Sequence, residues 1–104
     1  MHARKFDISL YILQFRRLAA RHQSGEGLKS ITENVEGLIK SLEIKLGDNC
    51  DYQVAVWEEL SRKLTLFVRN TSDPQWVNVI SYVRKRINTK KQTAIHRRKQ
   101  RRRS

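Results

Sequence analysis

The residues with the clearest chemical potential lie at the end of the chain, in INTKKQTAIHRRKQRRRS (residues 87–104). Eight of these residues are Lys or Arg, and none is acidic. Arginine carries a planar guanidinium that can hold a phosphate through two hydrogen bonds, whereas lysine acts as a point charge. The run predicts a polyanionic ligand, with nucleic acid first and an anionic membrane surface or an acidic protein second. A solvated run of charge is the alternative interpretation.

The net charge of +12 is unevenly distributed along the 104 residues. Residues 24–73 carry nine acidic and six basic side chains, whereas residues 74–104 carry eleven basic and no acidic ones. Net charge bears on association rather than on fold, so this asymmetry favours a polyanionic partner. The candidate nucleic-acid-binding residues are Arg84, Lys85, Arg86, Lys90, Lys91, Arg97, Arg98, Lys99, Arg101, Arg102 and Arg103, with Arg16, Arg17 and Arg21 as a second cluster.

Catalytic and metal-binding patterns have little support in the sequence. The three histidines are widely separated, and the adjacent Glu58 and Glu59 would not face each other on a helix. We therefore expect a protein that is not an enzyme and has no cofactor. The single Cys50 cannot form an internal disulfide, and no segment resembles a signal peptide or a membrane span. A nuclear or nucleolar protein is expected if the source is eukaryotic or viral, and otherwise a cytoplasmic one.

The elements that must position these residues are predicted to be four helices. Apolar residues recur at helical spacing over residues 8–22, 28–46 and 52–69, and Asp73 followed by Pro74 is a typical start of a fourth helix. Asp7 is a plausible N-cap of the first segment, and Gly47 a reasonable end of the second. The sequence thus predicts an all-α bundle over residues 1–88 and an arginine-rich tail over residues 89–104, disordered or partly helical.

More apolar surface is encoded on the first two segments than a four-helix monomer obviously needs. The predicted seam of residues 28–42 has an alternating three-four spacing, which suits antiparallel packing in a bundle as well as a dimer, and its length favours the bundle. Two further leucines fall off the apolar stripe of the first segment. These positions predict a homodimer or a protein partner, and they are Leu28, Ile31, Val35, Leu38 and Leu42 in the seam, with Leu10 and Leu13.

The two tryptophans are expected in the core, with exposure of one as a stacking platform for a base as the alternative. In VAVWEELSRKLTLFVRNTSDPQWVNVISYVRKRI, Trp57 and Trp76 are separated by eighteen residues, and eighteen more lead to Ile95. Residues 56–96 thereby resemble a Myb/SANT-type repeat. The resemblance implies that these three residues form a three-helix core and that a DNA-reading helix begins at Thr89. The acidic cluster of that family is displaced here, and the third helix has little apolar surface.

The end of the chain, HRRKQRRRS, resembles the arginine-rich motifs of small viral RNA-binding regulators and, equally, nuclear import signals. We expect a small nucleic-acid-binding protein that neutralises phosphates. RNA, including double-stranded RNA, is slightly favoured over DNA as the ligand. One alternative is a Myb/SANT-like DNA-binding regulator. Another is a helical adaptor, of viral or other origin, that binds another protein through its apolar helices and uses its tail as a nuclear import signal.

Overall fold

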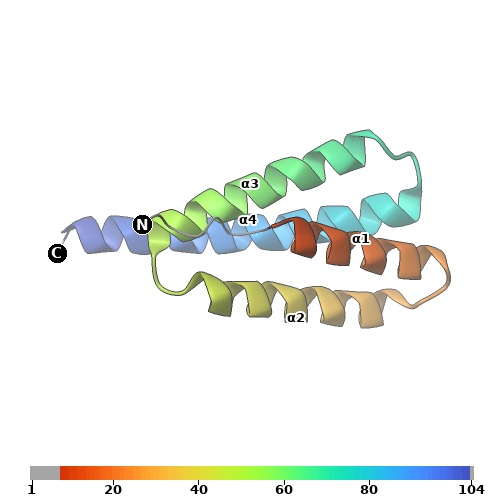
Figure 1. The fold of residues 1–104 in the computed structure, drawn as a ribbon, viewed down its shortest axis with the longest axis horizontal. Helices are drawn as coiled ribbons and strands as arrows, with labels where there is room; N and C mark the ends of the chain where they lie inside the picture. Colours follow the sequence, from red (N-terminus) through yellow and green to blue (C-terminus); the bar gives the residue numbers. More distant parts are fainter. Residues whose placement is uncertain (1–7, 104) are drawn as a thin grey trace.

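The computed structural model of the chain is an up-and-down bundle of four α-helices. The helices are α1 (Ser9–Gln23), α2 (Leu28–Leu46), α3 (Cys50–Arg69) and α4 (Pro74–Arg103). The structure describes residues 8–103, with side chains for residues 8–100. Successive helices run in opposite directions, and α4 extends beyond its neighbours at the C-terminal end (Figure 1). The predicted all-α class is confirmed, since the described residues contain no strand.

The helix ends follow from local chemistry. The Asn49 side chain caps α3 by accepting a hydrogen bond of 3.0 Å from the backbone N–H of Tyr52. The Asp73 carboxylate does the same at the start of α4, 2.8 Å from the N–H of Gln75. Gly47 ends α2 with a φ of +69°, which favours glycine. The predicted bounds of the first three helices and the predicted start of the fourth therefore hold to within about two residues, and the proposed N-cap Asp7 lies outside the described residues.

The core lies between the four helices and is built mainly from aliphatic residues, together with the aromatic residues Trp57, Phe15 and Tyr11. Trp57 is 1% exposed, in agreement with its predicted burial. Trp76 is only partly buried, which corrects the expectation of a second core tryptophan. Its indole N–H donates a 2.8 Å hydrogen bond to the Gln23 side chain near the end of α1, and this keeps one edge of the ring at the surface.

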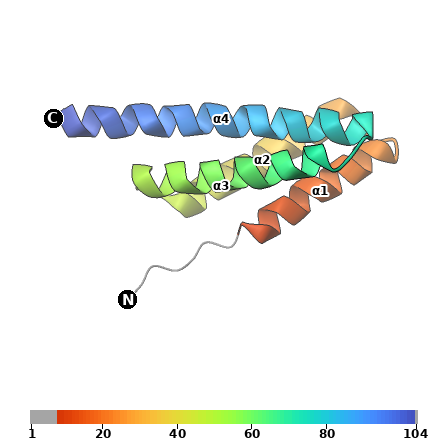
Figure 2. The ribbon, with the colours of Figure 1, turned by 90° about the horizontal axis from the view of Figure 1, so that it is seen from above.

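The long α4 determines where the basic residues lie. Its first half buries Val79, Ile80, Val83 and Ile87 against the other helices. The helix then continues without interruption through the predicted boundary after residue 88, and Ala94 beyond that boundary is 1% exposed. The predicted tail is therefore a direct continuation of a core helix. Figure 2 shows α4 as a straight helix along one edge of the bundle.

Candidate nucleic-acid interface

The basic residues of α4 fall into two groups, and the first group is held by carboxylates of the bundle. The strongest contact joins α4 to α2, where Arg86 Nε and Nη2 donate to the Glu36 carboxylate at 2.7 and 3.1 Å. Tyr82 Oη donates to the same carboxylate at 2.8 Å. The Arg86 hydrogen bond lowers the pKa of Glu36 from its ordinary value of 4.5, partial burial opposes this shift, and the Tyr82 hydrogen bond adds to it.

Two further ion pairs continue this pattern toward the C-terminus. Lys90 Nζ lies 3.1 Å from the Glu43 carboxylate near the end of α2. Arg98 Nη1 lies 3.2 Å from Asp51 Oδ1 in the first turn of α3. Three candidate ligand-binding residues are therefore already paired within the chain. The acidic residues of the middle segment are their partners, so part of the charge asymmetry has an internal explanation.

Five further cations of α4 within residues 8–100 make no ion pair with the described carboxylates. Lys85, Arg97 and Lys99 are exposed, whereas Arg84 and Lys91 are partly buried. The Nε atom of Arg84 is buried without a hydrogen-bond partner among the described residues, so this side chain is partly engaged in packing. The side chains of Arg101, Arg102 and Arg103 lie outside the described part of the chain. The exposed and unpaired members of this group are available to bind an anion from solvent.

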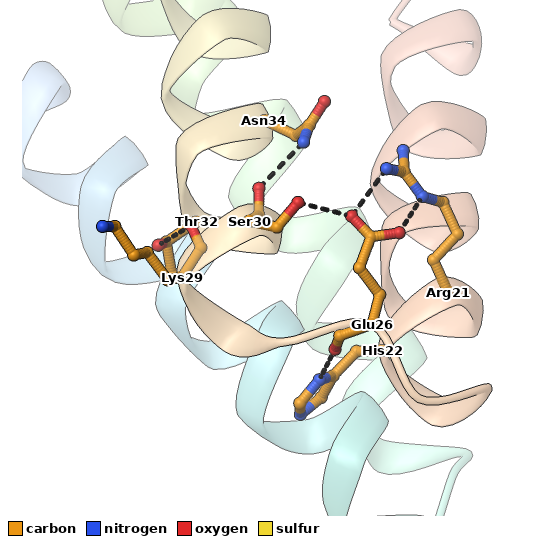
Figure 3. A network of polar contacts seen from close by, with 7 residues as sticks. All are labelled: Arg21, His22, Glu26, Lys29, Ser30, Thr32 and Asn34. Atoms are coloured by element: carbon orange, nitrogen blue, oxygen red, sulfur yellow. Dashed lines mark hydrogen bonds and ion pairs between the residues drawn. The ribbon is translucent and has the colours of Figure 1, made fainter.

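The three arginines of the predicted cluster on α1 make different contacts. Arg21 holds the Glu26 carboxylate through two hydrogen bonds of 2.7 Å, and Ser30 donates to the same carboxylate (Figure 3). This contact closes the turn between α1 and α2. Arg16 lies over the Phe67 ring of α3, 4.3 Å from its centroid. Arg17 alone is exposed without such a contact among the described residues.

The α1 cluster lies near the start of α4, at the opposite end of that helix from Arg97 and Lys99. Gln23, the last residue of α1, bonds Asp73 and Trp76 at the start of α4, so Arg21 lies near that start. Arg97 follows Asp73 by twenty-four residues, which is about 36 Å along a helix. The cations near the C-terminal end of α4 are therefore far from the α1 cluster, whereas Arg84, Lys85 and Arg86 follow Asp73 by only eleven to thirteen residues, or about 16–20 Å of helix.

The predicted partner surface on α2 is largely internal. Ile31, Val35 and Leu42 are at most 1% exposed, because this face packs against the rest of the bundle. Leu38 is partly buried, and Leu28 is 48% exposed. The buried part of the seam therefore offers no surface to a partner, which corrects that expectation. Leu10 and Leu13 on α1 are exposed, as the predicted partner surface requires, at 60% and 41%.

The other features of the described surface offer little support for a metal-binding, membrane-spanning or small-anion-binding site. Within residues 8–100, no three His, Cys, Asp or Glu side chains gather in a way that could hold a metal ion. None of the described helices is long and apolar enough to cross a bilayer. The shallow hollow on α2 has a volume of about 350 Å³ and is lined by Glu33, Asn34, Gly37 and Leu38. It contains no basic side chain that would favour an anion.

Comparison with known protein families, curated proteins and solved structures gives no match to this chain. The three positions of the Myb-like spacing differ in their surroundings. Trp57 is buried, Trp76 and Ile95 are partly buried, and Thr89 lies in the middle of a continuous helix. Functional interpretation therefore depends on the geometry and charge of α4.

Proposed function

We propose that this chain is a non-enzymatic nucleic-acid-binding protein that neutralises phosphates with the unpaired cations of α4 and the arginines at its end. The observation that carries the proposal is that α4 has eleven basic and no acidic residues. Internal carboxylates pair with Arg86, Lys90 and Arg98, whereas Lys85, Arg97 and Lys99 are exposed and make no ion pair with a described carboxylate. A rigid helix holds the charges of Lys85, Arg97 and Lys99 at fixed spacing, which reduces the entropy lost on binding.

A nucleic acid accounts for this arrangement better than a small anion. Lys85 and Lys99 are fourteen residues apart, or about 21 Å along the helix, and this distance exceeds the size of a single phosphate group. A nucleic-acid backbone presents many phosphates over such a length. The density of arginine near residues 97–103 favours RNA, because guanidinium groups bind phosphate and stack on unpaired bases. Duplex DNA is the alternative within the same class.

The proposal is tested by fluorescence anisotropy of the full chain with matched single- and double-stranded RNA and DNA. We expect binding that weakens steeply with salt. If five or six cations contact phosphates of a DNA duplex, the logarithm of the association constant falls against log salt with a slope of about −5, and less steeply for single strands. Undetectable binding to all four nucleic acids at low salt would refute the proposal.

A second candidate function is favoured by the exposed leucines of α1. Leu10 and Leu13 lie three residues apart and could contact another protein, while the basic end of α4 would act as a nuclear import signal. This adaptor would need its basic end for nuclear entry in cells but would show no nucleic-acid affinity when purified. Substituting both leucines with Ser would then abolish partner capture and leave import unchanged.

A further inference from the structure

The outward face of α4 carries a continuous row of polar side chains. Its members occur at intervals of three, four, four and three residues, so they lie on the same side of the helix. All of them are exposed, and they are Lys85, Asn88, Gln92, His96 and Lys99. The buried residues Val83, Ile87 and Ala94 occupy the opposite side. We refer to this row as the outer strip, and it contains no acidic and no apolar residue.

Two amides in the middle of the outer strip are available for recognition. Asn88 and Gln92 lie one helical turn apart, and neither side chain has a hydrogen-bond partner among the described residues. The neighbouring hydroxyls differ, because Thr89 and Thr93 each donate a 3.1 Å hydrogen bond to a carbonyl of their own helix. The strip thus places two solvent-exposed amides, neither with a described protein partner, between a cation at residue 85 and another at residue 99.

The position of α4 makes the strip accessible along its length. The helix is straight and forms one edge of the bundle (Figure 2), and each residue of the outer strip is exposed. An α-helix with its side chains is about 10–12 Å across, and the major groove of B-form DNA is about 12 Å wide. The major groove of A-form RNA is too narrow and deep for side chains to read. A regular duplex that accepts this helix in its major groove is therefore DNA.

We infer that the outer strip of α4 enters the major groove of duplex DNA, where Asn88 and Gln92 contact base edges. An Asn or Gln amide can bind the N6 and N7 atoms of adenine with two hydrogen bonds. Lys85 and Lys99 would contact the phosphates that border the groove. The inference depends on the proposed nucleic-acid binding, and it selects duplex DNA over the RNA that arginine density favours.

The ligand class is tested with the full chain on a DNA duplex and an RNA duplex of the same sequence. We expect tighter binding to the DNA, together with protection of guanine N7 from dimethyl sulfate, because N7 faces the major groove. Equal or tighter binding to the RNA duplex, or DNA binding without N7 protection, would overturn the inference and leave the proposed function intact. Failure to bind any nucleic acid would overturn both.

The role of the amides is tested on the best site selected from randomised DNA duplexes. We expect the N88A/Q92A variant to lose roughly tenfold or more of its preference for that site over random DNA, with an unchanged salt slope. The K85A/K99A variant should instead lower the salt slope by about 1.8 and keep the preference. A T89A/T93A variant serves as the control, because its hydroxyls bond within the helix. Unaltered preference in N88A/Q92A would overturn the assignment.

Discussion

The division of the α4 cations into paired and unpaired groups makes a quantitative prediction. The variant K85Q/R97Q/K99Q removes three exposed cations from α4 that have no described ion-pair partner. The control K29Q/K40Q/R69Q removes three exposed cations from α2 and α3. Each variant lowers the net charge from +12 to +9. Glutamine is close to Lys and Arg in helix propensity, so neither variant should lose its helices.

The expected difference follows from counterion release. If the three substituted α4 residues each contact one phosphate of a DNA duplex, their loss reduces the salt slope by about 2.7, from about −5 to about −2.3. Between 50 and 200 mM salt, the affinity of the parent then falls by about three orders of magnitude. The affinity of the variant falls by about 1.4 orders of magnitude over the same range. The control should keep the slope of the parent, since its substituted positions lie on other helices.

Anisotropy titrations at four or five salt concentrations measure these slopes, and circular dichroism verifies that both variants remain helical. An equal reduction of the slope in the α4 variant and in the control would refute the reasoning, because affinity would then depend on total charge rather than on the position of the cations on α4. If neither variant changes the slope, the phosphate contacts must come from residues on another part of the molecule.

Three further predictions concern the fold and the end of α4. Because its folded pKa is depressed, Glu36 should contribute stability above pH 4.5 that is lost as the pH falls through the folded pKa. E36Q should therefore reduce urea stability at pH 7, and its effect should shrink as the pH is lowered below 4.5. Trp57→Ala should cost about 3–5 kcal/mol in urea titration, and Trp76→Ala clearly less, because only Trp57 is fully buried. Ending the chain after Asn88 removes eight cations and should abolish most nucleic-acid affinity in gel shifts, while thermal melts show a folded bundle that has lost the contacts of Lys90 and Arg98.

The positions of the helices could be predicted from the sequence because the signals are local. An apolar residue every three or four positions, a carboxylate before Pro74 and a glycine at position 47 all act within one or two turns. The inward face of α2 was harder to predict. Its buried residues are Ile31, Val35, Ile39, Leu42 and Leu46. A heptad pattern selects Leu28 and Leu38 instead of Ile39 and Leu46, because it assumes one facing helix, whereas α2 packs against several.

The candidate interface could be predicted only in part. Composition identified α4 as basic, but it could not separate the paired cations from the unpaired ones. The carboxylates that pair with Arg86, Lys90 and Arg98 lie forty-seven or fifty residues away in the chain, so helix packing decides the partners. One signal was present: Glu36 and Glu43 are seven residues apart and thus share a face of α2. That spacing suits two cations on a neighbouring helix.

The two groups of cations depend on each other. A helix with eleven basic and no acidic residues repels itself, and like charges four residues apart, such as Arg86 and Lys90, destabilise it. Glu36 and Glu43 relieve this repulsion where α4 lies against α2, and Asp51 does so where it passes the start of α3. Buried apolar residues of α4 hold this helix on the bundle, and the ion pairs neutralise its charge on that side. Lys85 and Lys99 on the outer strip remain exposed and keep a fixed spacing. A phosphate backbone would neutralise the cations on the solvent side of α4, just as the carboxylates neutralise the cations on the side that faces the bundle.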